Sequence, residues 1–403
     1  MGLVCKLQEN PTLIEQTMAK TATYLDYNAA APLLDEARAA IIDALDVNAN
    51  PSSVHASGRA AKAIIAKARR QVADLVGAKP DHVIFTSGAT EAAQMLLTPH
   101  YSMGRSPLKV GHLYVCATDH PCTLAGGQFA KEAVSLIPVQ ASGIIDFDTL
   151  EETLRAHDKS SGLALVVCHA ANNETGVIQP FAKIGDIVKA AGGIFVLDAV
   201  QAVGRLDLTM TDTGADYLIL SSHKIGGPKG AGAIVAASDL VMPMPLIKGG
   251  GQERGHRGGT EAVVNIAGFG AAAESAKFSS ERFNALTDVQ NHLERGLRKA
   301  LPEIIIHGQV DGAEAPRLPN TTFFTVPNAK AETLQINFDL AGFAVSAGSA
   351  CSSGKVGRSH VLTAMGVEGD EGAIRVSFGH KTTKAEIDAF LVAFEQILAR
   401  MKR

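Results

Sequence analysis

The sequence predicts an α/β protein whose main element is a mostly parallel sheet covered by helices. Between Asp81 and Ala237, short runs of β-branched and aliphatic residues alternate with helical patterns, which is the order expected of repeated strand–helix–strand units. The chain has 403 residues, enough for two or three domains at about 150 residues each. With 46% hydrophobic and 19% charged residues, the composition is typical of a globular protein and not of a disordered or fibrous one.

The strands and helices of the first part of the chain follow from these patterns. Apolar residues at helical spacing predict helices over 33–45 and 58–76. Short apolar runs predict six buried strands, at residues 82–86, 112–117, 163–169, 193–200, 216–221 and 232–236. Ligands of such sheets bind at the carboxyl ends of the strands, so the chemistry is expected there.

The pattern changes after the glycine-rich segment 248–259. It then predicts helices and short strands in the order 261–277, 280–301, 303–307, 320–325, 343–346, 373–378 and 383–401, of which the first two and the last are helices. We therefore predict a large domain over residues 34–280. Residues 1–33 and 281–403 are predicted to form a smaller α+β domain.

Composition also limits the partners and the compartment. A net charge of −4 without a basic stripe argues against a nucleic-acid ligand and favours a small-molecule substrate. Five cysteines form no CxxC pair or Cys/His ladder, so we expect no disulfide framework, no metal site and a reducing, cytoplasmic environment. No apolar run approaches the 18 or so residues that a membrane span requires, and no secretory signal is expected.

A candidate anion site follows the strand at 82–86. The sequence contains no GxGxxG after a strand, no GxxxxGK[ST] and no HExxH, so nicotinamide, P-loop and zinc-protease chemistry lack their motifs. Residues 87–91 (SGATE) instead open an apolar helix, whose free N–H groups would bind an anion. For this segment alone, an ordinary helix cap by Ser87 or Thr90 is the commoner explanation.

An acid and an amine follow two neighbouring predicted strands. Asp198 ends an apolar run, where a carboxylate needs a cationic or protonated partner unless it only caps the next helix. Lys224 follows another strand within a glycine-rich turn, although a lysine in such a loop is usually solvated. Together with an anion site, they meet the needs of pyridoxal 5'-phosphate: a Schiff-base lysine, an acid for the ring nitrogen and a phosphate cradle. His120 would stack on the ring, and Asn173 and Gln201 would hydrogen-bond its edge.

The motifs resemble those of a known family in order and spacing over roughly residues 24–400. They are YLDYNAAAP (24–32), NPSSVHASG (50–58), SGATEA (87–92), ATDHPC (117–122), NNETGVIQP (172–180), DAVQAVG (198–204), SSHKIGGPKG (221–230), GGGQERGHRGGTEAVVNI (249–266), SAGSACSSG (346–354) and IRVSFG (374–379). This set is similar to the cysteine desulfurases that supply sulfur for iron–sulfur clusters and nitrogenase, within the class V aminotransferases. The resemblance implies a fold type I enzyme with a seven-stranded, mostly parallel sheet, acting as a homodimer.

The resemblance also implies a role for each matching residue. Lys224 would form the Schiff base, and Asp198 would pair with the pyridinium nitrogen. Gln201 would contact the phenolate oxygen, with His120 on the ring face and Asn173 beside the ring. The phosphate would be held by Ala89, Thr90, Ser221, His223 and, from the second subunit, Thr260. Arg375 would clamp the substrate carboxylate.

Cys351 distinguishes this resemblance from ordinary aminotransferases. Its neighbours in AGSACSSGKVG are small and are poor core material, which disfavours the alternative of a buried structural cysteine. The expected reaction converts L-cysteine to L-alanine, with Cys351 receiving a persulfide for a sulfur-acceptor protein such as a cluster scaffold. A selenocysteine lyase, another class V aminotransferase and a non-catalytic scaffold remain alternatives. The acceptor, the role of residues 1–20 and any contribution of Cys122 near the cofactor stay open.

Overall fold

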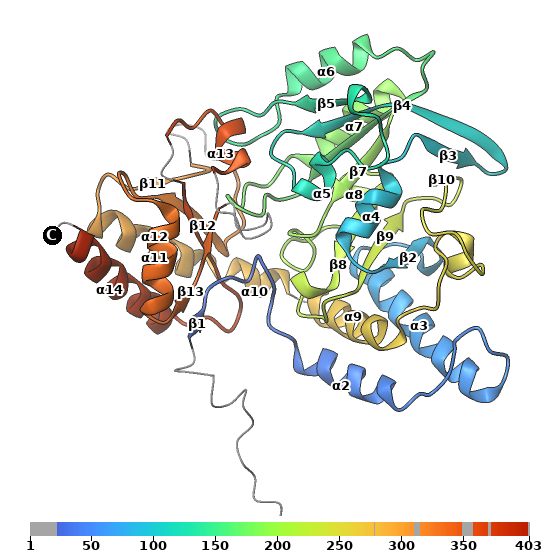
Figure 1. The fold of residues 1–403 in the computed structure, drawn as a ribbon, viewed down its shortest axis with the longest axis horizontal. Coiled ribbons are helices and arrows are strands. Elements are labelled where there is room, and N and C mark those ends of the chain that lie inside the picture. Colours follow the sequence, from blue (N-terminus) through green and yellow to red (C-terminus); the bar gives the residue numbers. More distant parts are fainter. Residues whose placement is uncertain (1–21, 278, 310–314, 349–357, 370–371, 402–403) are drawn as a thin grey trace, which may run out of the picture.

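The computed structural model describes residues 22–277, 279–309, 315–348, 358–369 and 372–401. Figure 1 shows a larger body built on a twisted sheet and, beside it, a smaller body that contains the C-terminal helix. Among the described residues, no helix is both long enough and apolar enough to cross a membrane.

The large sheet has nine described strands. Its order is β10-β3-β4-β6-β7-β8-β9-β2, and β5 pairs with β4. The strands are β2 (Val83–Thr86), β3 (His100–Met103), β4 (Ser106–Cys116), β5 (Val134–Ile137), β6 (Leu163–His169), β7 (Ile194–Asp198), β8 (Tyr217–Ser221), β9 (Gly232–Ala236) and β10 (Val241–Pro243). The pairs β5–β4, β4–β6, β6–β7 and β7–β8 are parallel, so the carboxyl ends of these strands lie at the same edge of the sheet.

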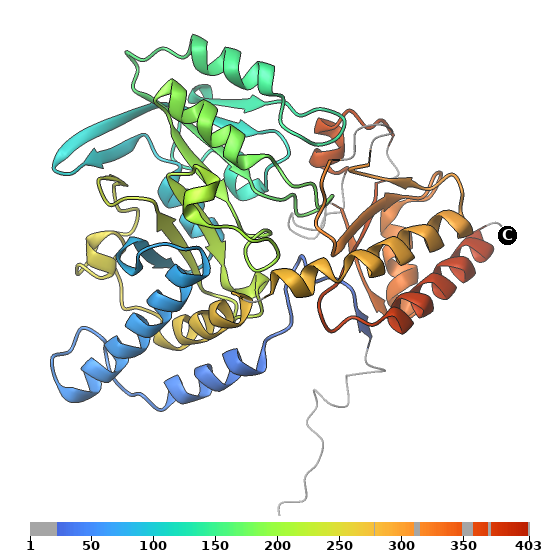
Figure 2. The same cartoon turned by 180° about the vertical axis from the view of Figure 1, so that it is seen from behind.

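Helices cover both faces of this sheet because its central strands are apolar on both sides. One face packs against α3 (Ala56–Leu75), α6 (Phe147–Ala156), α7 (Phe181–Ala191), α8 (Met210–Thr213) and α9 (Val263–Ala276), which Figure 2 shows from behind. The helix α2 (Asp35–Leu45) packs on α9. The opposite face packs against α4 (Ala89–Leu96) and α5 (Pro121–Leu124). The 3-10 helices are η1 (Pro80–His82), η2 (Lys131–Ala133), η3 (Ser222–Lys224) and η4 (Glu253–Gly255).

The small body has its own sheet and its own hydrophobic core. Its sheet has the order β11-β12-β15-β14, and β1 pairs with β13. These elements are β1 (Thr23–Tyr24), α10 (Ser280–Asn284), α11 (Thr287–Ala300), β11 (Ile305–Ile306), β12 (Thr321–Thr325), α12 (Ala331–Leu340), β13 (Phe343–Ala344), β14 (Ser346–Ala347), α13 (His360–Ala364), β15 (Ile374–Ser377) and α14 (Lys384–Met401). In this core, the ring of Phe338 stacks on that of Phe390, with the ring centroids 4.7 Å apart. Leu25, from the start of the described chain, also belongs to it.

The fold class expected from the sequence is confirmed, with differences in detail. The sheet has nine strands instead of seven, because β4 begins six residues earlier than the apolar run at 112–117 and pairs there with β3, which in turn pairs with β10. The strand expected at 343–346 is two strands, since the chain leaves its pairing with β1 for a pairing with β15 near Val345. The helix expected over 280–301 is also divided, into α10 and α11. The boundaries 34–280, 1–33 and 281–403 stay a prediction, which the two separate cores support.

Candidate active site

A cavity of about 480 Å³ opens at the carboxyl ends of three parallel strands. His169, Asp198 and Ser221 line it and are the last residues of β6, β7 and β8. The cavity is also where most of the residues expected from the sequence meet: Ala89, Thr90, His120, Asn173, Asp198, Gln201, Ser221, His223 and Lys224 all line it. The pattern of strand ends therefore located the cavity correctly.

The carboxylate of Asp198 is buried at the end of β7. Its Oδ1 accepts a hydrogen bond from the Val200 N–H at 3.0 Å, so the turn-forming role considered from the sequence is present. The side chain nevertheless lines the cavity. Burial raises the pKa of Asp198 to about 6, because no full hydration shell reaches the carboxylate. A cationic ligand group placed against Asp198 would restore the ionised form.

The amine of Lys224 reaches the same cavity from the turn after β8. Its Nζ donates hydrogen bonds to the carbonyl oxygens of Asn28, at 2.6 Å, and Ala29, at 2.9 Å. The turn is fixed by glycine: Gly226 has φ +85°, and a Cβ there would lie 2.6 Å from Cγ of Leu34. The half-buried amine is thus held at the cavity wall by the backbone, and it is not a solvated loop lysine.

The start of α4 offers an anion site. The N-cap residue is Gly88, which has no side chain to cap the first N–H groups of the helix. Neither Ser87 nor Thr90 caps the helix, so that alternative is wrong; instead the Ser87 N–H donates to Glu91 Oε2 at 2.8 Å. The uncapped N–H groups therefore face a cavity lined by Ala89 and Thr90, which suits a phosphate.

The imidazole of His120 is fixed and neutral. His120 is the N-cap of α5, and its Nδ1 accepts the Cys122 N–H at 3.2 Å, so the ring proton is on Nε2. Burial, followed by the charge of Lys224, lowers the pKa of His120 to about 4. A neutral ring at this place can lie against a flat ligand without the cost of burying a cation.

These side chains fit pyridoxal 5'-phosphate. The cofactor requires an amine for its aldehyde, a buried acid for its ring nitrogen and donors for its phosphate. Lys224, Asp198 and the uncapped start of α4 supply one group of each kind around a single cavity. On the phosphate side, Ser221 Oγ and His223 Nδ1 lie 3.0 Å apart.

Two expected residues that the structure describes, Thr260 and Arg375, do not line the cavity. Thr260 is exposed on the surface of the subunit. Arg375 is only 3% exposed; it donates to Asp26 Oδ1 at 2.7 Å and to the Asn173 carbonyl oxygen at 3.0 Å. Its Nε has no partner among the described residues. Cys351 lies outside the described residues.

Sequence reasoning missed Asn28. This residue is 1% exposed, its carbonyl oxygen accepts from Lys224, and its side chain donates to Thr321 Oγ1 of β12 at 2.9 Å. Asn28 therefore connects the amine to the small body. The signal was present as the single amide within YLDYNAAAP, but the apolar patterns that predict strands and helices give such a residue no partner.

A second buried acid, Glu174, gives a pH-dependent contribution to stability. Burial raises its pKa to about 7, although Ser359 Oγ donates to it at 2.5 Å. Because folding favours the protonated form, this contribution is complete below pH 4 to 5 and is lost as the pH rises through about 7. Glu174→Gln keeps the acceptor for Ser359 and removes the titration.

We therefore expect the free energy of unfolding of the cofactor-free wild type to fall more steeply between pH 5 and 8 than that of Glu174→Gln, by up to about 3 kcal/mol. Urea denaturation at several pH values measures both slopes. Other titrating groups are common to both proteins, so the difference isolates Glu174. The exposed Glu152→Gln serves as the control and should keep the wild-type slope; equal slopes for Glu174→Gln and wild type would contradict the expectation.

Comparison with known proteins identifies the family. Residues 23–390 match the family described as aminotransferase class-V. A cysteine desulfurase of Cereibacter sphaeroides is 37% identical over 387 residues, covering 94% of this chain and 96% of that protein. The cysteine desulfurase IscS of Dictyoglomus turgidum is 34% identical, covering 95% and 96%.

A solved structure gives the same result for the fold. The NifS-like protein of Rickettsia africae superposes with a TM-score of 0.84 at 35% identity, covering 94% of this chain and 99% of that one. Fold, cavity and sequence likeness agree. The chain therefore belongs to the class-V aminotransferase family, in which the relatives named above are cysteine desulfurases.

Proposed function

We propose that this protein is a pyridoxal 5'-phosphate-dependent cysteine desulfurase. It converts L-cysteine to L-alanine while the thiol of Cys351 takes up the substrate sulfur, so that one cysteine and one thiol give one alanine and one persulfide. The main support is the meeting of Lys224, Asp198 and His120 around one cavity of about 480 Å³. The full-length likeness to proteins named cysteine desulfurase supports the substrate.

Residues around the cavity would hold the cofactor. The phosphate is assigned to the start of α4 and the end of β8, with the residues Ala89, Thr90, Ser221 and His223, and to Thr260 of a second subunit. Asp198 is assigned to the ring nitrogen, Gln201 and Asn173 to the ring edge and His120 to the ring face. When bound, the cofactor supplies an electron sink for the carbanion charge that develops next to the substrate amine.

The protein groups then bind the substrate and move protons. Lys224 would hold the cofactor covalently, and its amine, once free, would serve as a base within the cavity. The neutral His120 offers Nε2–H as a second proton carrier. Arg375 is assigned to the substrate carboxylate; it already contacts Asn173, which lines the cavity, through the Asn173 carbonyl oxygen. Cys351 attacks the substrate sulfur as a thiolate, which is the nucleophilic form.

Product analysis tests the proposal against its alternatives. The purified protein should show a visible absorption band of bound cofactor and should form alanine and persulfide from L-cysteine in equal amounts. Turnover restricted to L-selenocysteine would favour a selenocysteine lyase. Amino-group transfer to a keto acid without sulfur release would favour another class V aminotransferase, and a colourless, inactive protein would favour a scaffold.

The sulfur would pass to an acceptor protein, such as a scaffold for iron–sulfur clusters, in the cytoplasm. Cys116, Cys122 and Cys168 are free thiols, which is compatible with a reducing compartment. A persulfide is suited to transfer because the outer sulfur can be taken by a second thiolate.

The active unit is proposed to be a homodimer in which Thr260 acts in the second subunit. We expect heterodimers of Lys224→Ala with Thr260→Val to recover about half of the wild-type activity per dimer, because one of the two sites regains both native residues. Activity of isolated, tagged heterodimers measures this recovery.

The matched control pairs Thr260→Val with the double variant Lys224→Ala/Thr260→Val. These heterodimers contain no site with both native residues if Thr260 acts in the second subunit, and they should stay impaired. Lack of recovery in the first heterodimer, when each parent is impaired, would show that Thr260 is not shared.

A further inference from the structure

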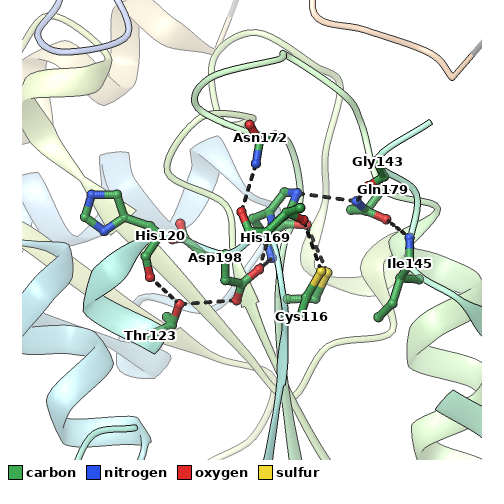
Figure 3. Close-up of polar contacts among 12 residues, drawn as sticks. Cys116, His120, Thr123, Gly143, Ile145, His169, Asn172, Gln179 and Asp198 are labelled. Atoms are coloured by element: carbon green, nitrogen blue, oxygen red, sulfur yellow. Dashed lines mark hydrogen bonds and ion pairs between the residues drawn. The ribbon is translucent and has the colours of Figure 1, made fainter. Parts of the chain in front are cut away.

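A chain of buried polar side chains extends away from the cavity, which one of its members, His169, lines, and it has no role in the proposed mechanism. Gln179 is 1% exposed, His169 is 4% exposed and Asp119 is fully buried. Figure 3 shows the imidazole of His169 between Gln179 and the turn that carries His120 and Thr123. Buried polar groups of this kind require hydrogen-bond partners, and here they are partners of one another.

The direction of the chain is set at Gln179. Its Nε2 donates to the Gly143 carbonyl oxygen at 2.7 Å, and its Oε1 accepts the Ile145 N–H at 3.0 Å, so the orientation of the amide is fixed by the backbone. The same Nε2 lies 3.4 Å from His169 Nε2. This contact is a hydrogen bond only if His169 Nε2 is the acceptor. The ring proton of His169 is then on Nδ1, which lies 2.6 Å from Asp119 Oδ1.

Asp119 connects His169 to the turn that carries His120. Its Oδ1 also accepts the His169 backbone N–H at 2.9 Å, and its Oδ2 lies 3.2 Å from Thr123 Oγ1. That hydroxyl lies 2.8 Å from the His120 carbonyl oxygen as well. The carboxylate therefore sits against the single turn of α5 whose N-cap is His120. From the small body, His360 Nε2 donates to the Asp119 carbonyl oxygen at 2.8 Å.

A metal ion is the competing explanation for this cluster. Cys116 and Cys168 lie beside Asp119 and His169, and the four ligand atoms are within 4.8 Å of one another. Such a donor set would suit zinc. A metal on His169 Nδ1 would, however, place the ring proton on Nε2, facing the amide group of Gln179 that the backbone holds as a donor. The hydrogen bonds are better satisfied without an ion.

We propose that Gln179, His169 and Asp119 are positioning residues that fix the imidazole of His120 in the cavity. The inference deepens the proposed function and rests on it only for the role of His120. Its first test, the protonation pattern of His169, does not depend on turnover. Failure of this inference is therefore distinguishable from failure of the proposed function.

The test begins with nitrogen NMR of the cofactor-free dimer, labelled at its histidine rings, with the His169 signal assigned by its loss in His169→Gln. Burial lowers the pKa of His169, but the contact with the Asp119 carboxylate raises it more, so the net shift is upward and all spectra are recorded above that titration. Under these conditions wild type is expected to show a neutral ring protonated at Nδ1. Gln179→Glu replaces the donor by an acceptor of the same size and should add a proton at Nε2. A proton on Nε2 of the wild type, or one equivalent of a bound transition metal by elemental analysis, would overturn the proposal.

Asp119 gives the second test. In Asp119→Asn, Oδ1 still accepts both bonds from His169, while Nδ2 donates to Thr123 Oγ1 and frees that hydroxyl to donate to the His120 carbonyl. We expect kcat within about 3-fold of wild type for Asp119→Asn, but a fall of about 10-fold or more in Asp119→Leu with little change in KM for L-cysteine, because the chemical step loses its positioned imidazole.

The control is His307→Gln, which removes an equally buried histidine from the small core. His307→Gln should lower the free energy of unfolding, but it should not lower kcat at an unchanged KM as Asp119→Leu does. If Asp119→Asn loses as much activity as Asp119→Leu, the proposal is wrong. The activity would then depend on the negative charge of Asp119 or on a metal bound by it, and not on its hydrogen-bond geometry. Should Asp119→Leu fail to fold, the activity of Asp119→Asn and the NMR spectrum of Gln179→Glu still test the proposal.

Discussion

Lys224→Ala is expected to lose desulfurase activity by more than about a thousand-fold, because no remaining group combines the covalent and the proton-transfer role. The amine is placed by carbonyl oxygens of Asn28 and Ala29 and by a turn that needs glycine at 226. Asp198 and the start of α4 are untouched by the substitution. Weak, non-covalent binding of the cofactor should therefore persist.

The control for this experiment is Lys229, the other lysine among the described residues that line the cavity. Lys229 is exposed, so Lys229→Ala should keep most of the activity and the full covalent attachment. Reduction of the loaded wild type with borohydride, followed by peptide mapping, identifies the attached lysine. Trapping of the cofactor on Lys229, or on any lysine other than Lys224, would show that the assignment is wrong.

The positions of Asp198 and Lys224 could be predicted from the sequence for a simple reason. Both follow continuous apolar runs that can only be buried strands, and parallel strands end at the same edge of a sheet. The structure has Asp198 as the last residue of β7 and Lys224 three residues after the end of β8. The local sequence pattern and the sheet topology together were therefore enough to predict that the two side chains lie close to each other.

Other parts of the site depend on contacts that no local pattern contains. Asn28 meets Lys224 and Thr321 across distances of roughly 200 and 300 residues in the chain. His169 ends an apolar strand and, taken alone, predicts only a strand end; its partners Asp119 and Gln179 belong to other segments. The additional strand pairs at β3 and β10 were missed because the amino-terminal half of β4 is polar and partly exposed.

The last element of the proposal is the identity of the thiol that receives sulfur. The surroundings of the three described cysteines argue against each of them in this role. Cys116 and Cys168 are fully buried. Cys122 lines the cavity, but burial, followed by the charge of Asp198, raises the pKa of its thiol well above the ordinary range. A thiol held neutral in this way is a poor nucleophile. Cys5 and Cys351 lie outside the described residues, and of these two only Cys351 lies within the motifs that resemble those of cysteine desulfurases.

Cys351→Ser is therefore expected to keep the cofactor and to bind L-cysteine, yet to lose alanine and persulfide formation by more than about a hundred-fold. A serine hydroxyl is similar in size but is not ionised near neutral pH, whereas a thiol with an ordinary pKa of about 8.5 is partly ionised. The free energy of unfolding should change little, because serine suits a segment of small residues. Alanine formed and sulfur bound per subunit measure the loss, with cofactor content checked by absorption.

Cys122→Ser and Cys5→Ser are the matched controls, since each removes one thiol and leaves Cys351 in place. Both should form alanine at a rate close to wild type, and mass spectrometry should find the added sulfur on the peptide that contains Cys351. Cys122 is the sharper control because it is the thiol that lines the cavity beside Asp198. If Cys122→Ser alone eliminates the bound sulfur, Cys351 is not the sulfur acceptor and the assignment is wrong. If Cys351→Ser turns over L-cysteine at the wild-type rate, no protein thiol in that segment is needed and a lyase or aminotransferase becomes the better description.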